Sequence, residues 1–375
     1  MKILQLIPRF TVGGAERLAL EYAKRLPAFG FSVTVASVRG GGELVEDYRL
    51  LFEPESQSRR QTTDYRLLVG EDGWVFAFFH TLKRLRAYVR EGQPDIIHTH
   101  IFSSDVAGYL LKRWFPQIKW ISAQHNVARQ HSWWRQLVLR HILRRADRVI
   151  AVSPRVAHDS RSRFGVSEER LALLPNGIAL APWLVVEAAG LLSSPTLRLA
   201  TIGRLTQQKG QDILLRALAR VPDIAWQLDI FGEGEDRQRL ESLVQELGLQ
   251  ERVRFHGAVD DLPKRLQDID VVVAPSRWEG MSLTVMEAMA AGRVVVASNP
   301  AGEGLIEDMK TGIIINAECR MQNAELVDAL RWVGTHRMEA KTMAENARQH
   351  ATEYFGIEKH LQMLTGVYCE LCDRN

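Results

Sequence analysis

Cysteine is scarce in this chain, and long apolar runs are missing from it. Three cysteines in 375 residues cannot form a disulfide framework. Cys369 and Cys372 lack the two further ligands that a zinc site would need nearby. No apolar stretch approaches the roughly 18 residues of a membrane span, and the apolar run after Met1 is too short for a secretory signal. These absences favour a cytoplasmic protein with free thiols.

The chain also has no large excess of charge of one sign. Lysine and arginine total 48 against 45 acidic residues, which gives a net charge of +3. This excess is too small to indicate a nucleic-acid partner, and no nucleic-acid-binding module is recognisable. Hydrophobic residues make up 46% and charged residues 25%, a globular balance. Because 375 residues exceed what a single core usually reaches, we expect two domains.

Short apolar runs alternate with amphipathic helical stretches along the chain, which predicts parallel sheets and an α/β fold. The predicted strands are 3–7, 32–37, 95–98, 119–123, 148–152, 198–202, 225–231, 252–256, 270–274 and 294–297. The predicted helices are 14–28, 75–90, 104–114, 133–145, 211–220, 236–246, 262–267, 283–291 and most of 321–372. Segment 39–73 shows no readable pattern. Residues 179–195 are rich in Pro, Gly and Ser and are predicted to be a linker.

Two glutamates eight positions apart stand at the end of a predicted strand. Glu279 lies in the loop after 271–274, and Glu287 lies in the helix that follows. Ligands of open α/β sheets bind beyond the carboxyl ends of the strands, so both carboxylates fall where a ligand is expected. By spacing alone, the pair could equally be solvent-exposed side chains of a helix.

Two basic residues occupy the equivalent position after the first strand of the second half. Arg204 and Lys209 belong to the segment Gly-Arg-Leu-Thr-Gln-Gln-Lys-Gly. Arginine offers a planar fork to phosphate oxygens and lysine offers a point charge, so the two could neutralise a diphosphate. The alternative is a solvated basic turn.

Glycine pairs mark two further strand ends. Gly232 and Gly234 follow strand 225–231, and Gly13 and Gly14 open the first helix. Glycines allow close approach of backbone to a ligand, and free N–H groups at a helix start bind oxygens. The third glycine and the ribose-binding acid of the dinucleotide fingerprint are missing, which disfavours a hydride-transfer enzyme.

These segments together resemble retaining glycosyltransferases, in particular glycosyltransferase family 4, over nearly the whole chain. The resemblance implies that Arg204 and Lys209 bind the donor diphosphate, that Glu279 faces the donor sugar and that Glu287 accepts hydrogen bonds from the ribose. The amides of Met281, Ser282 and Leu283 would contact phosphate or sugar oxygens, and the backbone at Gly232 and Gly234 would approach the nucleotide. Gly13 and Gly14 would lie beside the phosphates and the acceptor. This chain has Glu-Gly-Met-Ser where many members have Glu-Gly-Phe-Gly, and its Ala301-Gly302 departs from the usual Gly-Gly pair.

Three histidines end two neighbouring strands of the first half. His98 and His100 follow one strand and His125 follows the next. A metal site would need acidic or cysteine ligands at suitable spacing, and none is evident. The resemblance implies that His125 contacts the donor sugar near the reacting carbon. For His98 and His100, a structural role in fixing a loop competes with a role in the site.

A basic and aromatic segment, 129–148, contains Trp133, Trp134 and several arginines. On a helix, Trp134, Leu137, Val138 and His141 fall on one side. Such a composition suits an anionic membrane surface, and it also suits a core helix with one solvated face.

The fold that the resemblance implies is GT-B, with two Rossmann-like doubly wound domains facing a central cleft. The expected domains are 1–178 for the acceptor and 196–355 for the nucleotide-sugar, with 356–375 packing back on the first domain. The expected reaction moves a sugar from a UDP- or GDP-sugar to an acceptor hydroxyl, with no metal or other cofactor. A lipid-linked or polysaccharide acceptor in bacterial cell-surface or lipopolysaccharide biosynthesis, at the cytoplasmic face of the inner membrane, is the expected setting. The alternatives are a nucleotide-sugar epimerase, a phosphorylase and a non-catalytic nucleotide-binding homologue. The sequence does not fix the oligomeric state.

Overall fold

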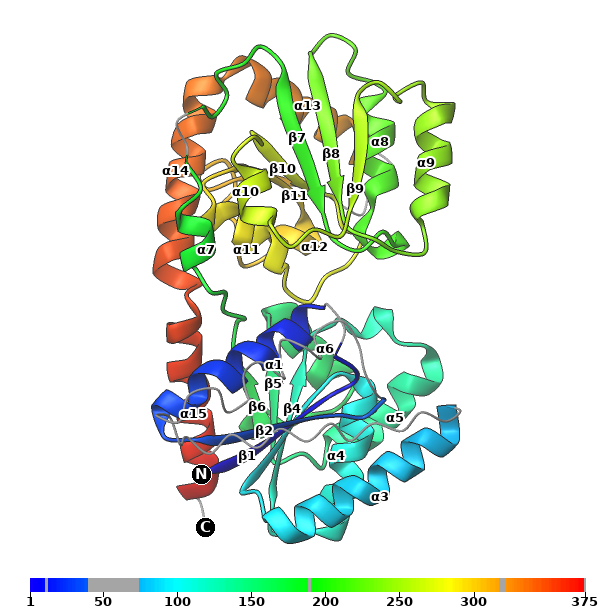
Figure 1. The fold of residues 1–375 in the computed structure, drawn as a ribbon, viewed down its shortest axis with the longest axis vertical. Coiled ribbons are helices and arrows are strands. Elements are labelled where there is room, and N and C mark those ends of the chain that lie inside the picture. The colour runs from blue at the N-terminus through cyan, green and yellow to red at the C-terminus, as the bar shows by residue number, and fades with distance from the viewer. Residues whose placement is uncertain (11–12, 40–73, 188–189, 317–321, 374–375) are drawn as a thin grey trace. The chain divides into compact units, whose positions relative to one another are not determined.

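A computed structural model describes residues 1–10, 13–39, 74–187, 190–316 and 322–373 (Figure 1). Most of segment 39–73, as well as Thr11 and Val12, lies outside the described residues. The chain divides into two compact units. Unit 1 consists of Met1–Gly177 and Ile357–Asn375, and unit 2 of Ile178–Gly356. No helix in the described part of the chain is both long and apolar enough to span a bilayer.

Unit 1 contains a six-stranded sheet in the order β2-β1-β3-β4-β5-β6, and every strand pair is parallel. Its strands are β1 (Lys2–Ile7), β2 (Ser32–Ser37), β3 (Ile96–His100), β4 (Lys119–Gln124), β5 (Arg148–Ala151) and β6 (Leu171–Leu173). Its helices are α1 (Gly14–Arg25), α3 (Trp74–Gly92), α4 (Phe102–Trp114), α5 (Trp133–Leu143), α6 (Pro154–Ser162) and α15 (Ile357–Asp373).

The sheet of unit 1 is buried on both faces because its strands are apolar at successive positions. Ile3 packs with helices α1 and α15, whereas its neighbour Leu4 packs on the opposite face with α3, α4 and α5. This arrangement gives three layers, in which α15, the last helix of the chain, completes the core of the first half (Figure 1). Burial on both faces is typical of parallel sheets.

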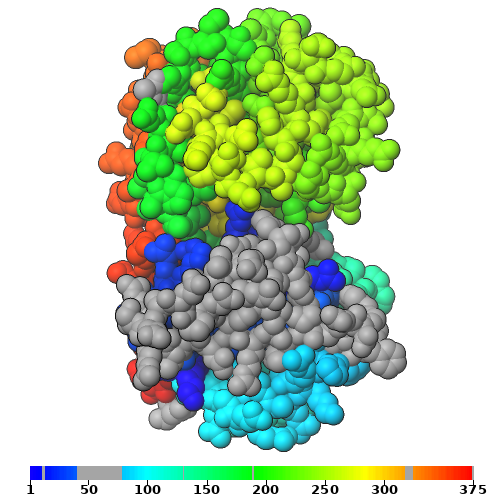
Figure 2. Space-filling model, in the orientation of Figure 1, coloured from blue at the N-terminus to red at the C-terminus, as the bar shows by residue number. Residues whose placement is uncertain are grey.

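Unit 2 repeats the architecture with the strand order β12-β11-β10-β7-β8-β9, again entirely parallel. Its strands are β7 (Leu197–Ile202), β8 (Trp226–Phe231), β9 (Val253–Gly257), β10 (Val271–Ala274), β11 (Val294–Ser298) and β12 (Ile313–Ile315). Its helices are α7 (Ala181–Leu184), α8 (Gln211–Leu218), α9 (Arg237–Glu246), α10 (Leu262–Leu266), α11 (Leu283–Ala290), α12 (Asn299–Gly302), α13 (Gln322–Thr335) and α14 (Arg337–Tyr354). On the face seen in the space-filling view, unit 2 presents a continuous surface of green to yellow residues (Figure 2).

The core of unit 2 also has two faces. Helices α8, α9 and α13 cover one face, and α7, α11 and α14 cover the other. The central strands β10 and β11 are buried at every position, as their runs of valine predict. The predicted α/β fold with two doubly wound sheets is therefore confirmed.

The segment expected to be a linker, 179–195, belongs to the core of unit 2. Helix α7 places Trp183 at 7% exposure, and Leu191 and Leu192 are also buried. The Leu192 amide donates a hydrogen bond to the Asp270 carboxylate, at 2.6 Å. The apolar residues of this segment show no helical or strand period, so the sequence pattern did not indicate burial. They are buried all the same, because each one packs into the core individually.

Candidate active site

The loop between β10 and α11 carries the first predicted glutamate, and its position follows from the sequence. Pro275 ends the buried strand, and Ser282 begins α11 by accepting a hydrogen bond from the Val285 amide at its side-chain oxygen, at 3.4 Å. A hydrogen bond from the end of β11 holds this loop in place, because Ser298 Oγ donates to the carbonyl oxygen of Ser276, at 2.6 Å. Glu279 therefore lies at the carboxyl end of a central strand, as predicted.

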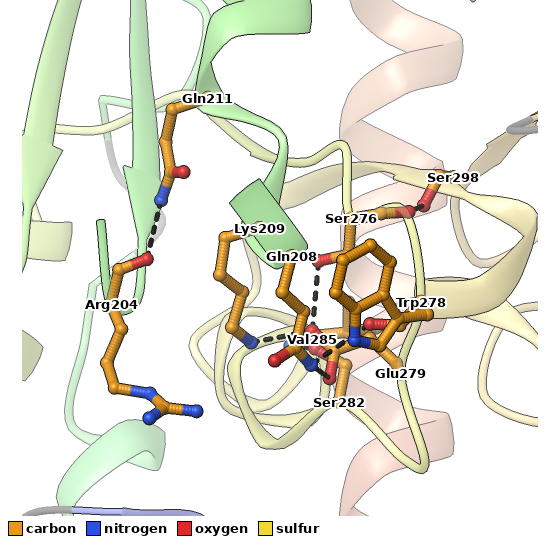
Figure 3. Close-up of polar contacts among 10 residues, drawn as sticks. All are labelled: Arg204, Gln208, Lys209, Gln211, Ser276, Trp278, Glu279, Ser282, Val285 and Ser298. Carbon is orange, nitrogen blue, oxygen red and sulfur yellow. Dashed lines mark hydrogen bonds and ion pairs between the residues drawn. The ribbon is translucent and has the colours of Figure 1, made fainter. Parts of the chain in front are cut away.

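Glu279 and Lys209 form an ion pair across two strand ends. The Lys209 Nζ lies 2.6 Å from Glu279 Oε1, and the two groups come from loops that follow β7 and β10 (Figure 3). The same carboxylate accepts hydrogen bonds from Ser276 Oγ at 2.9 Å and from Gln208 Nε2 at 3.4 Å. Glu279 is only 7% exposed, so its charge is balanced within the protein. Its carboxylate thus fixes the position of the lysine ammonium.

A second ion pair ties the same two loops together. Arg277 donates from both terminal nitrogens to the Asp212 carboxylate, at 2.8 and 2.7 Å. The Arg277 amide also donates to the Gln208 carbonyl oxygen, at 2.8 Å. Burial alone would raise the pKa of Asp212, but the hydrogen bonds and charge of Arg277 lower it overall. This bidentate contact holds the loop of Lys209 against the loop of Glu279.

Arg204 is the exposed cation of this region. Its backbone carbonyl accepts a hydrogen bond from Gln211 Nε2 at 3.1 Å, and its side chain extends away from that contact (Figure 3). Within the described residues, its guanidinium has no hydrogen-bonding or ionic partner. Lys209 is held and Arg204 is free, so the two predicted phosphate ligands differ in how much they are preorganised.

Glycine is required in the turn after β8 by the packing of the neighbouring loop, whether or not a ligand binds there. A side chain at Gly232 would overlap the carbonyl oxygen of Gly203, and one at Gly234 would overlap that of Leu205. The backbone of Leu205 donates to Glu233 O at 2.9 Å, which joins the two loops. Close contact between strand-end loops thus requires glycine at both predicted positions.

The start of α11 carries the remaining predicted residues of unit 2. Met281 and Leu283 are half-buried, Ser282 is buried as the cap, and Glu287 lies half-buried one turn further along. Two polar atoms in the neighbouring loops, Trp278 Nε1 and Thr206 Oγ1, are buried without a hydrogen-bond partner among the described residues. Buried polar atoms without a partner are uncommon in native proteins, and they fit a region that binds a polar ligand.

In unit 1 the structure brings the predicted histidines together in one hydrogen-bonded cluster. His100 Nδ1 lies 3.0 Å from His125 Nε2, and His100 Nε2 lies 2.7 Å from Gln5 Oε1. His98 Nδ1 lies 2.7 Å from the Tyr368 hydroxyl, on α15. His98 and His100 are fully buried, and His125 is half-buried just beyond the end of β4.

Burial keeps these imidazoles neutral. It lowers the pKa of His98 to about 3 and that of His125 to about 4, with smaller contributions from neighbouring histidines, and it lowers the pKa of His100 well below its usual value. The hydrogen bonds of these rings go to one another and to neutral groups, and His98 Nε2 is buried without a hydrogen-bond partner among the described residues. Across the described parts of the chain, no group of three or more His, Cys, Asp or Glu residues is placed to hold a metal ion.

Gly13 and Gly14 stand at the start of α1, as predicted. Gly13 is the residue before the helix and, as a glycine, supplies no side-chain cap of its own. A side chain at Gly13 would overlap the Glu16 carboxylate. The backbone at Gly13 therefore lies close to the Glu16 carboxylate, and the glycine pair in the sequence did not indicate this contact.

Segment 129–148 contains helix α5, as predicted. The buried side of α5 is formed by Leu139, Ile142 and Leu143, so the side that carries Trp134 and Leu137 is not the buried one. Trp133 is 74% exposed and Leu137 is 58% exposed. The last arginine of the predicted basic set is buried. Arg148 donates to the Glu169 carbonyl oxygen at 2.7 Å and pairs with Glu370 at 3.2 Å. It therefore belongs to the interior of unit 1.

Several residues of these sites were not predicted. Gln208, Asp212 and Arg277 link two loops that are some 65 to 71 residues apart in the sequence. Gln5 and Tyr368, which contact the histidines, are 363 residues apart. Local sequence patterns cannot indicate such long-range pairs. The only available signal was proximity in sequence, since Gln208 precedes Lys209 and Arg277 lies two residues before Glu279.

Comparison with known proteins agrees with this geometry. Residues 12–181 match the family model described as Glycosyltransferase Family 4, and residues 190–350 match the one described as Glycosyl transferases group 1. A D-inositol 3-phosphate glycosyltransferase of Xylanimonas cellulosilytica is 27% identical over 336 residues, which cover 80% of this chain and 78% of the relative. A glycogen synthase of Mycobacterium tuberculosis is 26% identical over 382 residues, which cover 93% of this chain and 89% of that protein.

A solved structure, Anabaena Alr3699/HepE in complex with UDP-glucose, superposes with a TM-score of 0.84 at 21% identity and covers 99% of this chain and 100% of that one. At this identity the likeness concerns the fold. Both halves of the chain match glycosyltransferase models, and the curated relatives are glycosyltransferases. The chain is therefore a glycosyltransferase with the GT-B fold.

Proposed function

We propose that this enzyme transfers a hexose from a nucleotide-sugar to an acceptor hydroxyl, with retention of configuration at the anomeric carbon. The observation that carries the proposal is the Lys209–Glu279 pair at the strand ends of unit 2, together with the unpartnered guanidinium of Arg204. Two cations in the loop between β7 and α8 suit a nucleoside diphosphate, whose negative charge increases as the sugar departs.

In the proposed reaction, the bond between the anomeric carbon and the diphosphate oxygen breaks while the acceptor oxygen attacks the same face. The electron pair of the broken bond stays on the diphosphate, and the leaving oxygen takes the acceptor's proton. Lys209 and Arg204 stabilise the leaving diphosphate, so catalysis rests on charges that are already in place. No side-chain nucleophile and no metal are needed.

The remaining residues have binding roles in this proposal. Glu279 holds the Lys209 ammonium and faces the donor sugar. Glu287 accepts hydrogen bonds from the ribose hydroxyls, and the amides at the start of α11 contact phosphate or sugar oxygens. His125 of unit 1 contacts the sugar. The UDP-glucose bound by the Anabaena structure supports a UDP-sugar as the donor to test first.

We also propose a lipid-linked or polysaccharide acceptor of the bacterial cell surface, used at the cytoplasmic face of the inner membrane. The supporting observation is α5, where Trp133, Trp134 and Leu137 are exposed beside the exposed Arg140. Exposed tryptophan next to basic residues suits an anionic lipid surface. A lipid-linked acceptor would be presented at such a surface.

The test is thermal unfolding in the presence of UDP, GDP, ADP or CMP and their sugars. A ligand at 100 times its dissociation constant adds about 2.7 kcal/mol to the free energy of unfolding. We expect one nucleotide to raise the unfolding midpoint and its sugar conjugate to raise it further. Proton NMR of the slow hydrolysis of that donor should then show the retained anomer first. No shift with any nucleotide, or the inverted anomer as first product, would contradict the proposal.

A further inference from the structure

The hydrogen bonds around His125 fix which of its two ring nitrogens carries the proton. The starting point is Gln5, whose amide nitrogen lies 3.2 Å from the Tyr368 hydroxyl and can only donate. Its carbonyl oxygen, Oε1, lies 2.7 Å from His100 Nε2 and can only accept. His100 Nε2 must therefore carry a proton, and in the neutral ring His100 Nδ1 is left as an acceptor.

The next contact passes this constraint to His125. His100 Nδ1 lies 3.0 Å from His125 Nε2, so His125 Nε2 must be the donor. The neutral His125 ring then has an unprotonated Nδ1. Within the described residues that atom has no hydrogen-bond partner, and the ring is half-buried just past the carboxyl end of β4. In a parallel α/β sheet, this is the end at which ligands bind.

At the other end of the chain of contacts, the Tyr368 hydroxyl accepts from the Gln5 amide at 3.2 Å and lies 2.7 Å from His98 Nδ1. Gln5 Nε2 can only donate and also lies 3.4 Å from His98 Nδ1, which favours Nδ1 as an acceptor that the Tyr368 hydroxyl donates to. His98 Nε2 is then a buried donor without a partner among the described residues. Gln5, His98, His100 and Tyr368 are each fully buried, so no solvent competes for these contacts. The last helix, α15, thereby sets the orientation of the Gln5 amide.

A local backbone feature accompanies the network. Ile101, which follows His100, has a φ of +71° and a ψ of 159°, a combination that is costly for a β-branched residue. Ser104 Oγ donates to the Ile101 carbonyl oxygen at 2.9 Å. The end of β3 is held in this conformation by its surroundings, and His100 is the residue that it places.

We propose that Gln5 and His100 are positioning residues that hold His125 as a hydrogen-bond acceptor, with the proton on Nε2 and the lone pair of Nδ1 presented to a sugar hydroxyl. The identity of the ligand as a sugar rests on the function proposed above, whereas the protonation pattern does not. A hydroxyl can donate to Nδ1, but a carbonyl or carboxylate oxygen cannot. His125 would therefore select a donor that presents a hydroxyl at this point, and it would not act as a general acid.

The first measurement is NMR of the full-length chain labelled with ¹⁵N-histidine, with His125→Asn used to assign the His125 ring. Long-range ¹H–¹⁵N correlations distinguish a protonated from an unprotonated ring nitrogen. We expect the proton on Nε2 of His125 near pH 7.5 without any ligand. A proton on Nδ1 would overturn the proposal, because it requires the Gln5 amide to be rotated and the whole chain of donors reversed.

The second measurement separates positioning from structural support. Binding of UDP and UDP-glucose is titrated into wild type, His100→Leu, His100→Asn and His360→Leu. Asparagine keeps an acceptor near the place of Nδ1, and leucine removes it. His360 is a matched buried imidazole, hydrogen-bonded to Tyr22 at 2.6 Å and to Pro175 O at 2.6 Å, outside the chain that ends at His125.

We expect His100→Leu to reduce the advantage of UDP-glucose over UDP by about 3- to 10-fold, which is the value of one hydrogen bond. His100→Asn should recover most of that advantage, and His360→Leu should leave it unchanged. Equal losses in His100→Leu and His360→Leu would reduce the cluster to a structural role and contradict the proposal. If a variant fails to fold, the wild-type NMR result still decides it. If wild type binds no nucleotide-sugar but His125 carries its proton on Nε2, the proposed function fails and the positioning inference stands.

Discussion

The ion pairs at the candidate site of unit 2 join charged side chains, whereas the hydrogen bonds of the candidate site of unit 1 join neutral ones. In unit 2, Lys209 is paired with the carboxylate of Glu279, and Arg277 with that of Asp212 at the start of α8. In unit 1, His100 and His125 are held by other imidazoles and an amide, and burial keeps them uncharged. Both groups lie at the carboxyl ends of parallel strands, so the same architecture supports two different kinds of chemistry.

The difference follows from what surrounds each group. Charged loops in unit 2 remain partly open to solvent, so charges persist and can meet a diphosphate. The histidines of unit 1 lie in a core between α1, α15 and the sheet, where an unpaired charge would be costly. Charge suits the stabilisation of a leaving group, and neutral hydrogen bonding suits recognition of hydroxyls. The predictions below test whether this division of roles holds.

The largest expected effect is on turnover. Lys209→Ala should lower kcat by roughly 10²-fold or more, because one stabilising charge on the leaving diphosphate is removed. Lys310→Ala is a matched control, since Lys310 is also paired with a glutamate, Glu307, but is solvent-exposed. Steady-state rates at saturating donor measure the effect. An unchanged kcat in Lys209→Ala would remove this lysine from the charged site.

The buried histidines of unit 1 should make the free energy of unfolding depend on pH. The pKa is lowered by burial to about 3 for His98 and to about 4 for both His125 and His360, so their contribution to stability is present above pH 6.5 and is lost as the pH falls toward 4. Burial raises the pKa of Asp105 to about 6 despite three hydrogen bonds, which acts in the opposite direction below pH 6. Each histidine should cost up to about 1.4 kcal/mol per pH unit in this window.

Urea unfolding at several values between pH 7.5 and 5 measures this dependence. We expect a clear loss of stability toward pH 5, because the buried histidines outweigh one aspartate, and a shallower loss in His360→Leu. A midpoint that stays constant over the whole range would mean that the histidines are charged or solvated, and the contrast between the units would not hold.

A smaller effect is expected on donor affinity. Glu287→Ala should weaken UDP binding by about tenfold, since hydrogen bonds to a charged group are worth roughly 1.5–3 kcal/mol. The rate at saturating donor should change little. Calorimetric titration of UDP checks this, with Glu325→Ala in α13 as an acidic control outside the candidate site. Unchanged UDP affinity would exclude Glu287 from the ribose site.

The smallest expected effect concerns membrane attachment. Replacing Trp133 and Trp134 by alanine should reduce binding to phosphatidylglycerol-containing vesicles severalfold, because exposed aromatic area is lost. Nucleotide binding by unit 2 should not change. Co-sedimentation measures the effect, and wild type that ignores such vesicles would refute the membrane proposal.

Many strands could be predicted because they are runs of apolar, often β-branched residues, and several of them, such as β1, β7, β8 and β10, are followed directly by proline or glycine. Strand 32–37 was predicted with its observed bounds, and 270–274 with an error of one residue. The strands that were missed, β6 and β12, have three residues each and are too short to show a pattern. Helix α6 was also missed, although Ser153 caps it and Pro154 begins it.

The individual segments of the candidate site could be predicted from the sequence, but the contacts between them could not. Lys209 and Glu279 each follow a strand, and parallel strands place their carboxyl ends at one edge, so both could be assigned to the same region. Their ion pair depends on side chains 70 residues apart, and the network that reaches His125 depends on the last helix of the chain. Such contacts arise only when the sheet and its covering helices are assembled.

The most direct test is a calorimetric titration of UDP and of UDP-glucose into wild type, Lys209→Ala and His125→Ala. If unit 2 supplies charge and unit 1 supplies a neutral acceptor, Lys209→Ala weakens both ligands by a similar factor. His125→Ala then weakens UDP-glucose alone and leaves UDP unchanged. Equal weakening of UDP by both variants, or unchanged UDP binding in Lys209→Ala, would contradict this division between the two units.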